Sequence, residues 1–349
     1  MRSPLSLAAA VLSLSLSAFA AAAPAPASPA RASRPPAGER LDHALLWGRS
    51  PDQITAAMTV KLGFQVAPGR PQDGLANRYV RLDDERFIEL LALTGNGGAL
   101  DPGAQADQAQ LHGGPGARTF GLHTDALDAA RAALLAQGQK TTPVFSAAAD
   151  DPDGTGPGTA PRWSLFVLDP SPLSNHLFYI HYPPARADIA ADRRIARVHA
   201  NGARELSSLW LLSADADADR AQLAKLGHDR AVPVRLPQIG ARGYCVAIGP
   251  TQLLALQPDG DGEAAQALAR GGAQIAGIGI GVDDLARAQR RVERGYERTL
   301  TRYAGLAGAS FLAPSQDDLG LWIEFHQRGK SATACGAGQA AAAGAKTSR

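Results

Sequence analysis

The sequence predicts an α+β fold made of four repeats of a β-α-β-β-β unit. Four helix signals of almost equal length follow one another along the chain, and each is preceded by an apolar strand pattern. After each helix signal come three further strand-like runs and then a break. The strings KLG and LLAL each occur in both the first and the third unit. Because one such unit cannot bury its own sheet, we expect the first unit to pair with the second and the third with the fourth.

The four helices are predicted from their caps and from the glycines that end them. Ser50 precedes Pro51, a favoured first helical residue, and Gln53 completes a capping box. An aspartate opens each of the other three helices, and a glycine closes all four. The helices so predicted run from Ser50 to Gly63, Asp125 to Gly138, Asp215 to Gly227 and Asp283 to Gly295. The spacing from cap to glycine is 13, 13, 12 and 12 residues, which supports a repeat.

The strands are predicted from runs of apolar and β-branched residues around these helices. The first unit opens with LDHALLW at 41–47. The strands after the helices are predicted at 64–70, 76–82 and 86–93 in the first unit, 140–147, 162–169 and 176–182 in the second, 231–238, 243–249 and 251–257 in the third, and 297–305, 309–315 and 319–327 in the fourth. The first two units then form a domain over 41–185 and the last two a domain over 200–328, with 186–199 as a partly helical linker.

The two ends of the chain differ from the rest in composition. Arg2, an apolar run and small residues within positions 1–22 predict a signal peptide, cleaved after Ala20 or Ala22. A periplasmic or secreted protein is therefore expected. Residues 23–40, rich in Ala and Pro, are predicted to be a disordered linker, and residues 329–349 a disordered tail.

Charge and cysteine content narrow the partners. The 35 Lys and Arg residues are scattered among 33 Asp and Glu, for a net charge of +2, so no basic stripe is offered to nucleic acid. No segment after the signal peptide is apolar enough to span a membrane. We expect a small-molecule ligand, and the sequence leaves a homodimer open. A disulfide between Cys245 and Cys335 is disfavoured, because it would tie a buried strand to the tail.

The first unit carries motifs that resemble a known family. LDHALLW, PGR at 68–70, GLAN at 74–77 and RFIEL at 86–90, within paired units over 41–328, are similar to the glyoxalase-like branch of the vicinal oxygen chelate superfamily (glyoxalase, bleomycin resistance and dioxygenase proteins). The resemblance implies two domains of this type, each with a half-barrel cleft around a divalent metal held by first and last strands. Because members include several enzyme classes and antibiotic-binding proteins, the fold alone selects no reaction.

His43 and Glu89 are the leading candidates for metal ligands. Alternate strand residues share a face, and Glu89 lies within the apolar run FIELLAL, where an unpaired charge is costly to bury. A shared cation would satisfy both residues, and an imidazole with a carboxylate suits Zn, Fe, Mn or Ni. On periodicity alone, a core histidine and a glutamate that reaches solvent is the simpler interpretation. The resemblance favours the metal.

Carrying these positions onto the other units completes the predicted site. Seven residues before each remaining cap, where the first strand would offer a ligand, stand Arg118, Ser208 and Ala276. The last strands offer His181, Gln252 and Glu324. The amino-terminal pair would thus supply His43, Glu89 and His181, which leave positions open for substrate as in a catalytic site. The carboxy-terminal pair is expected to be degenerate and to hold no metal.

Arg118 stands where the superfamily has a fourth ligand, and three interpretations stay open. Its guanidinium repels a cation, so that no metal is bound; or it binds the carboxylate of an anionic substrate beside the metal; or a bulge shifts the strand register and His123 is the true ligand. His176 and His181 are five residues apart and face opposite ways, so only one of them is expected in the cleft.

The expected function is that of a divalent-metal-dependent lyase or isomerase that chelates a small molecule through adjacent oxygens and stabilises enolate-like charge. Glu89 or His181 would carry the proton. Trp47 and Tyr79 would bind an apolar part of the substrate, although both also suit a plain core. The alternative is a non-catalytic periplasmic protein that binds a small molecule or an antibiotic. An extradiol dioxygenase is disfavoured, because the second domain lacks the two histidines such enzymes usually have there.

Overall fold

The four predicted units are present, and their strands pair in the same way. In the first unit, β1 (Arg40–Trp47) pairs in parallel with β4 (Phe87–Leu93), β4 pairs antiparallel with β3 (Leu75–Arg81), and β3 pairs with β2 (Ala67–Pro68). In every other unit the first strand is again parallel to the last. The remaining strands are β5 (Gly116–His123), β6 (Phe145–Ser146), β7 (Ser164–Val167), β8 (His176–His181), β9 (Ala203–Leu212), β10 (Ala231–Leu236), β11 (Ala241–Ile248), β12 (Thr251–Pro258), β13 (Gln274–Val282), β14 (Arg302–Gly305), β15 (Gly308–Ala313) and β16 (Trp322–Gln327). The predicted fold class is confirmed.

The computed structural model describes residues 35–36, 38–70, 74–82, 86–94, 100, 102–112, 114–329 and 335. The described residues belong to one compact unit. The predicted signal peptide and most of the predicted linker and tail lie outside the described residues. Within the part of the chain that is described, no helix has the length and apolar character needed to cross a bilayer.

Each unit carries a helix after its first strand. These helices are α1 (Pro51–Ala56), which continues as a π-helix (Ala57–Lys61), α3 (Leu127–Ala136), α5 (Ala216–Lys225) and α7 (Leu285–Tyr296). Ser50 caps α1 by accepting a hydrogen bond from the backbone N–H of Gln53, and Asp215 caps α5 through the N–H of Ala218. Both caps are as predicted.

The other two predicted caps are wrong by one residue. The N-cap of α3 is Ala126, because the Asp125 carboxylate bonds His123 Nε2 at 3.0 Å instead. The N-cap of α7 is Asp284, whereas Asp283 pairs with arginine side chains. The helices themselves begin where the pattern indicated, to within one or two residues.

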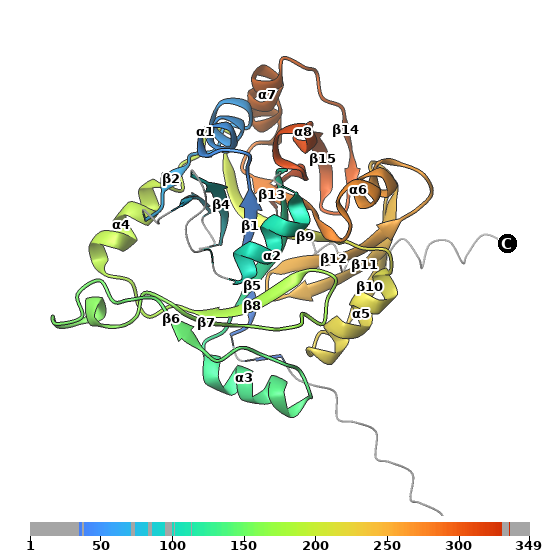
Figure 1. Ribbon diagram of the computed structural model, residues 1–349. Coiled ribbons are helices and arrows are strands. Elements are labelled where there is room, and N and C mark those ends of the chain that lie inside the picture. Colours follow the sequence, from blue (N-terminus) through green and yellow to red (C-terminus); the bar gives the residue numbers. More distant parts are fainter. Residues whose placement is uncertain are drawn as a thin grey trace, which may run out of the picture. The chain divides into compact units, whose positions relative to one another are not determined.

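Four further helices were not assigned from the sequence pattern, apart from the expectation that the linker is partly helical. They are α2 (Pro102–Leu111), α4 (Ala187–Ile195), α6 (Glu263–Gly271) and α8 (Gln316–Leu319). α4 lies inside the predicted linker 186–199. α2 packs against β5, and Figure 1 shows it lying across β1 and β5.

The first strands join the units into one sheet. β1 pairs antiparallel with β5, and β9 pairs antiparallel with β13, so the units pair in the predicted order. β5 and β13 meet through one residue pair, Ala117 and Ile275, which links the two halves. The domain boundaries at 41–185 and 200–328 stay a prediction.

The two faces of this sheet have different roles. One face packs under the helices in a main core that includes Leu41, Leu122, Leu209 and Ile280. The opposite face, called the second face below, carries two smaller apolar clusters. One surrounds Trp47 and includes Leu75, Leu91 and Ala104, and the other surrounds Trp210 and includes Cys245, Ala276 and Trp322. Polar side chains from the first and last strands of the units also lie on the second face.

Cys245 and Cys335 form a disulfide, with their Cα atoms 5.4 Å apart. The expectation that they stay unpaired is wrong. Cys245 is fully buried in the cluster around Trp210, and Cys335 packs against the same cluster. Apolar packing therefore brings residue 335 to the strand, a contact that composition alone did not reveal. A bridge between residues 90 positions apart restrains the unfolded chain strongly.

Candidate functional site

A bulge in β1 places two consecutive polar residues on the second face. The register against β5 shifts between Leu41 and His43, which leaves Asp42 as an extra residue. Leu41 and Ala44 both pack in the main core, so Asp42 and His43 turn together to the opposite side. The register shifts in the other first strands leave the extra residues Arg118, Arg204, Ser207 and Ala276.

Asp42, His43 and Glu89 form a chain of contacts, called the acid–imidazole chain below. His43 Nδ1 lies 2.5 Å from Asp42 Oδ1, and His43 Nε2 lies 3.4 Å from Glu89 Oε2. The parallel pairing explains this approach, because Phe87 is the β4 partner of His43 and Glu89 stands two residues further along. The Glu89 side chain is 18% exposed, against 4% for His43. Glu89 is therefore the member that a small molecule can reach.

Neighbouring polar groups donate hydrogen bonds to both carboxylates of the acid–imidazole chain, those of Asp42 and Glu89. The Tyr182 hydroxyl donates to Asp42 Oδ1 at 3.0 Å. Asn77 Nδ2 donates to Glu89 Oε1 at 3.4 Å and to the Tyr79 hydroxyl oxygen at 3.0 Å. Asn77 and Tyr79 alternate on β3, which pairs with β4, so both reach Glu89 from the adjacent strand.

Aromatic rings enclose the imidazole. The Phe87 ring stacks on His43 with its centroid 4.2 Å away, and the Phe178 ring meets it edge-on at 5.2 Å. Gly121 makes room for Phe178, because a Cβ on that glycine would lie 2.5 Å from the ring. This packing fixes the orientation of His43.

The acid–imidazole chain and its surroundings shift the pKa values of His43, Tyr79 and Tyr182. Burial opposes a charge on His43, but hydrogen bonds to Asp42 and Glu89 and the charges of these carboxylates outweigh it and raise the pKa of His43 to about 9. Burial, reinforced by the charge of Glu89, raises the pKa of Tyr79. Burial and then Asp42 raise the pKa of Tyr182 well above its ordinary value. His43 is thus an imidazolium at neutral pH, and both phenols remain hydrogen-bond donors.

Two of the three predicted metal ligands could share a cation. Neighbouring ligands of a tetrahedral site with ~2.1 Å bonds stand ~3.4 Å apart, which matches the 3.4 Å between His43 Nε2 and Glu89 Oε2. Asp42, behind His43, is the kind of partner that orients a metal-bound imidazole.

The third predicted ligand, His181, is engaged elsewhere. Its Nδ1 lies 3.1 Å from the carbonyl oxygen of Thr124, and its ring lies beside that of His123 at 6.0 Å. The residue of β8 that corresponds to Glu89 is Phe178, because His176 is the strand partner of Thr119 and Phe178 stands two residues further along. Phenylalanine offers no ligand there.

The described donor set therefore falls short of a metal centre. Among the residues that the structure describes, no group of three His, Cys, Asp or Glu side chains is arranged to hold a metal ion. His43 and Glu89 supply two ligands where a catalytic zinc site uses three. These residues do not fit a tightly held cation.

Arg118 is also engaged outside the acid–imidazole chain. It is the extra residue of β5, and its guanidinium donates to Gln110 Oε1 at 2.9 Å and to the carbonyl oxygens of Gly271 and Ala273. The one-residue error in the caps explains its misplacement. Counted seven residues back from the observed caps, the corresponding positions are His43, Thr119, Ser208 and Gly277, each directly after an extra residue.

The remaining predicted residues divide between core and site. Trp47 is fully buried, and its Nε1 donates to Asp107 Oδ2 at 3.1 Å, so it supports α2 instead of lining an open wall. Tyr79 borders the acid–imidazole chain through Asn77, and its role in binding substrate stays a prediction. His123 does share the second face, because of the bulge at Arg118, and its Nε2 bonds Asp125.

The carboxy-terminal half keeps only part of this arrangement. Glu324 corresponds to Glu89, because it stands two residues past Trp322, the strand partner of Gly277. Burial raises the pKa of Glu324 to about 7, although the Tyr303 hydroxyl, which donates to it at 2.6 Å, acts in the opposite direction. Where the first unit has His43, the fourth has Gly277, so Glu324 has no imidazole partner there. Gln252, the other predicted residue, pairs with Ser208 on the second face.

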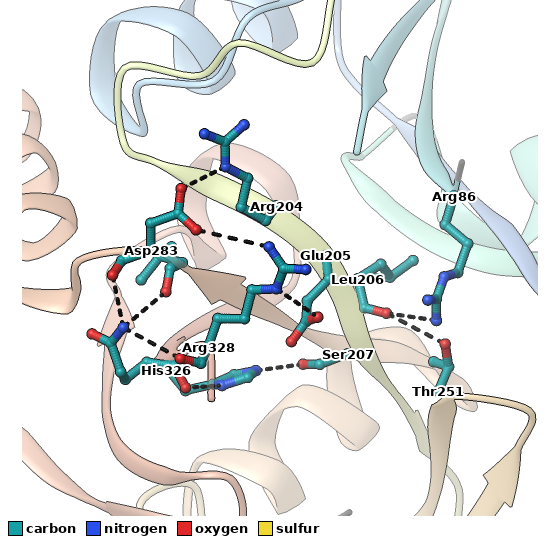
Figure 2. A network of polar contacts seen from close by, with 11 residues as sticks. Arg86, Arg204, Glu205, Leu206, Ser207, Thr251, Asp283, His326 and Arg328 are labelled. Carbon is teal, nitrogen blue, oxygen red and sulfur yellow. Dashed lines mark hydrogen bonds and ion pairs between the residues drawn. The ribbon is translucent and has the colours of Figure 1, made fainter. Parts of the chain in front are cut away.

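Figure 2 shows a second polar network at the ends of β9 and β16. Asp283 contacts Arg204 at 2.6 Å and Arg328 at 3.8 Å. Beside them, His326 Nε2 lies 2.7 Å from Ser207 Oγ. Burial lowers the pKa of His326, which favours its neutral form. These contacts pair the charged groups with one another and tie the strand ends together.

Three residues of the site were not predicted: Asp42, Asn77 and Tyr182. Period-two alternation along 76–82 places Asn77 on the face of Tyr79, so that residue could have been found. Asp42 could not have been found in this way, because strict alternation places neighbouring residues on opposite faces. The bulge in β1 is what puts Asp42 and His43 on the same face.

Comparisons with known proteins agree with this architecture. A family model described as a glyoxalase-like domain matches residues 41–227, more than half of the chain. A variant of 4-hydroxymandelate synthase from Streptomyces coelicolor superposes with a TM-score of 0.56 at 14% identity, over 87% of this chain and 96% of the other. A hypothetical protein from Staphylococcus aureus gives 0.54 at 12% identity, over 83% and 100%. An extradiol ring-cleaving dioxygenase from B. fuscum gives 0.52 at 13%, over 88% and 76%. Such low identities show the fold alone, and no curated protein matches the sequence.

Proposed function

This chain belongs to the glyoxalase-like domain family, and from that premise we propose that it is an exported enzyme that moves a proton on a small molecule with adjacent oxygens. The observation that carries the proposal is the acid–imidazole chain, in which one partly exposed carboxylate, Glu89, is backed by a buried imidazolium. The reaction class is that of a lyase or isomerase that passes through an enolate.

Glu89 is the proton carrier in this proposal. His43 Nε2 lies against one of its oxygens and Asn77 Nδ2 against the other, so the carboxylate is held in one orientation. A carboxylate fixed in this way can take the proton from the carbon beside a substrate carbonyl group. His43 does not itself reach the substrate. It acts as a positioning residue, and Asp42 orients it in turn.

Tyr79 is the donor for the negative charge that develops on the substrate oxygen. Its hydroxyl oxygen accepts from Asn77, and no acceptor among the described residues takes its own hydrogen. Its raised pKa keeps that hydrogen in place. A preorganised donor beside the base stabilises an enolate oxygen. A divalent cation would supply similar stabilisation, but because the described residues offer only His43 and Glu89 as ligands here, the proposal assigns this task to Tyr79.

The disulfide supports the proposed export. Disulfides form and persist in oxidising compartments and are rare in the cytosol, and this chain joins both of its cysteines. The signal peptide predicted at 1–22 independently indicates a periplasmic or secreted protein. Amino-terminal sequencing of protein recovered from the periplasm or medium tests this part of the proposal. A chain that stays in the cytosol with residues 1–22 attached would contradict it.

The second candidate function is small-molecule binding without catalysis. It is favoured by the aromatic enclosure of Phe87 and Phe178 around His43, which would suit an aromatic or antibiotic ligand. Such a protein would bind its ligand beside Glu89 but would not exchange the protons of that ligand.

Carbon–hydrogen exchange distinguishes the two functions. The mature full-length protein is incubated in D₂O with hydroxyacetone, dihydroxyacetone or methylglyoxal, and loss of the exchanging proton is followed by NMR. We expect exchange faster than in buffer for at least one probe. The exchange rate should fall at least about 100-fold in Glu89→Gln and about 10-fold or more in Tyr79→Phe. These are the effects expected for loss of a positioned base and of a single oxyanion donor.

The outcomes separate the proposals. If the wild-type protein is no faster than Glu89→Gln with every probe, the enzymatic proposal is overturned, and saturable binding of an aromatic ligand by calorimetry would support the second candidate. Elemental analysis on the same samples reports metal. One ion per chain whose removal abolishes exchange would overturn the assignment of charge stabilisation to Tyr79.

A further inference from the structure

A second carboxylate–histidine pair lies on the same face of the sheet. Asp107 of α2 is fully buried and accepts hydrogen bonds from Trp47 Nε1 at 3.1 Å and Thr119 Oγ1 at 2.8 Å. The third group at this carboxylate is His176 of β8, whose Nδ1 lies 2.9 Å from Asp107 Oδ1. No family motif or sequence pattern assigned a role to this pair.

The contacts of Asp107 decide where His176 carries its proton. The indole and the hydroxyl both donate to the carboxylate, which as an ion can only accept. The imidazole must therefore present an N–H at Nδ1, so that in its neutral form the lone pair lies on Nε2. The His176 side chain is 29% exposed, whereas that of Asp107 is 1% exposed. Within the described residues no hydrogen bond engages His176 Nε2. His176 is thus an oriented, accessible proton acceptor.

Strand pairing places this acceptor across from Glu89. Glu89 is the strand partner of Leu45, Leu45 is the partner of Thr119, and Thr119 is the partner of His176. The neighbours of His176 and Glu89 on their strands, such as Leu177 and Leu90, pack in the main core, so both polar side chains turn to the second face. Three strand spacings separate the two backbones by ~14 Å along the sheet. Leu45 and Thr119 occupy the two positions between them in this row, so a substrate that reaches both Glu89 and His176 lies over these two side chains.

We propose that His176 is a second catalytic residue, which carries an oxygen-bound proton of the same substrate while Glu89 carries the carbon-bound one, with Asp107 as its positioning residue. The inference rests on the proposed function and narrows it to an isomerase of α-hydroxy aldehydes and ketones. Glu89 takes the proton from the hydroxyl-bearing carbon, and the electron pair of that bond makes the enediolate. His176 Nε2 takes the hydroxyl proton and returns it to the former carbonyl oxygen. Glu89 returns its proton to the other carbon, so no oxidant or co-reactant is required.

The two proton transfers can be measured separately with hydroxyacetone. Exchange of its hydroxymethyl protons in D₂O reports the Glu89 step alone, whereas formation of lactaldehyde reports transfer between both carbons and both oxygens. In His176→Gln we expect exchange within about threefold of wild type and isomerisation reduced at least about 100-fold. Glu89→Gln should lose both. Gln105→Ala, an exposed position on the same helix as Asp107, is the control and should change neither.

A structural readout tests the pair without turnover. Long-range ¹H–¹⁵N correlation of the histidine ring in the full-length protein should show His176 as the Nδ1–H tautomer, and Asp107→Asn should mix the two tautomers and lower isomerisation more than exchange. If the wild-type protein exchanges protons but forms no lactaldehyde, or if His176→Gln isomerises at the wild-type rate, the inference is overturned while the proposed function stands. If the wild-type protein carries out neither reaction with hydroxyacetone, the inference is overturned, and the proposed function fails with it only if dihydroxyacetone and methylglyoxal show no exchange either.

Discussion

The raised pKa of His43 makes the stability of the fold depend on pH in a defined direction. The folded protein holds a proton on His43 up to about pH 9, whereas the unfolded chain releases it near 6.5. The corresponding stabilisation is fully present below pH 6.5 and is lost as the pH rises through 9. At about 1.4 kcal/mol per pH unit, this difference corresponds to about 3 kcal/mol. His43 is 3% exposed, so solvent screening reduces the value little.

Urea unfolding at pH 6.0 and at pH 9.5, for the wild type and His43→Gln, measures this contribution. The variant removes the titrating group but keeps a side chain of similar reach, so the other titrating groups cancel in the comparison. We expect the free energy of unfolding of the wild type to fall between the two pH values by about 3 kcal/mol more than that of the variant. A ¹H NMR titration of the His43 ring should give a midpoint near 9. Parallel pH profiles for the two proteins would refute the assigned charge state and with it the imidazolium behind Glu89.

Three further predictions concern the fold. Cys335→Ser should lower the free energy of unfolding by about 2 to 4 kcal/mol, the usual effect of losing a disulfide that closes a long loop, and reduction of the wild type should lower it equally. Ser50→Ala should cost about 1 kcal/mol by loss of the α1 cap, whereas Asp125→Ala should cost no cap energy in α3, so equal losses would contradict the cap assignment. Gly121→Ala should destabilise the protein by about 1 to 3 kcal/mol, because its Cβ would press on the Phe178 ring, and thermal melts that match the wild type would show that the ring can move aside.

The repeat could be predicted from the sequence because its signals are local. A cap, an amphipathic helix and a closing glycine lie within 13 residues, and apolar runs follow at regular intervals. Because these signals are local, they do not always identify the N-cap residue correctly. Asp125 and Asp283 both suit a cap by type, yet each has a stronger partner, and the helix begins one residue later. Which partner a carboxylate takes is decided by tertiary contacts.

The candidate site could be predicted only where it follows strand alternation. His43 and Glu89 stood out because each is polar within an apolar run, and the family resemblance then favoured a shared site; the structure brings them within 3.4 Å. Asp42 and Asp107 could not be found in this way. The first reaches the second face through a bulge, and the second comes from α2, which shows no amphipathic pattern in the sequence and is placed by packing against Trp47. The disulfide was missed for the same reason, since contact between distant segments has no local signal.

Bulges in the first strands explain why the acid–imidazole chain occurs in one unit although all four share a backbone. One bulge in each first strand puts the residue that follows it beside the last strand of its unit, and those residues are His43, Thr119, Ser208 and Gly277. Of these four side chains, only the imidazole can link two carboxylates, and the first unit combines it with an acid two residues past its strand partner. The fourth unit has an acid at that place, Glu324, but no imidazole.

The fourth unit shows that one substitution does not restore the arrangement. It keeps the acid, Glu324, but the space beside it is filled, because a Cβ on Gly277 would lie 2.4 Å from the Trp210 ring. A histidine at 277 would therefore also require a smaller residue at 210, and Trp210 is fixed in turn by its hydrogen bond to Ser208 Oγ at 3.0 Å. Packing on the second face, more than the loss of any single side chain, prevents the carboxy-terminal half from adopting the acid–imidazole arrangement of the first unit.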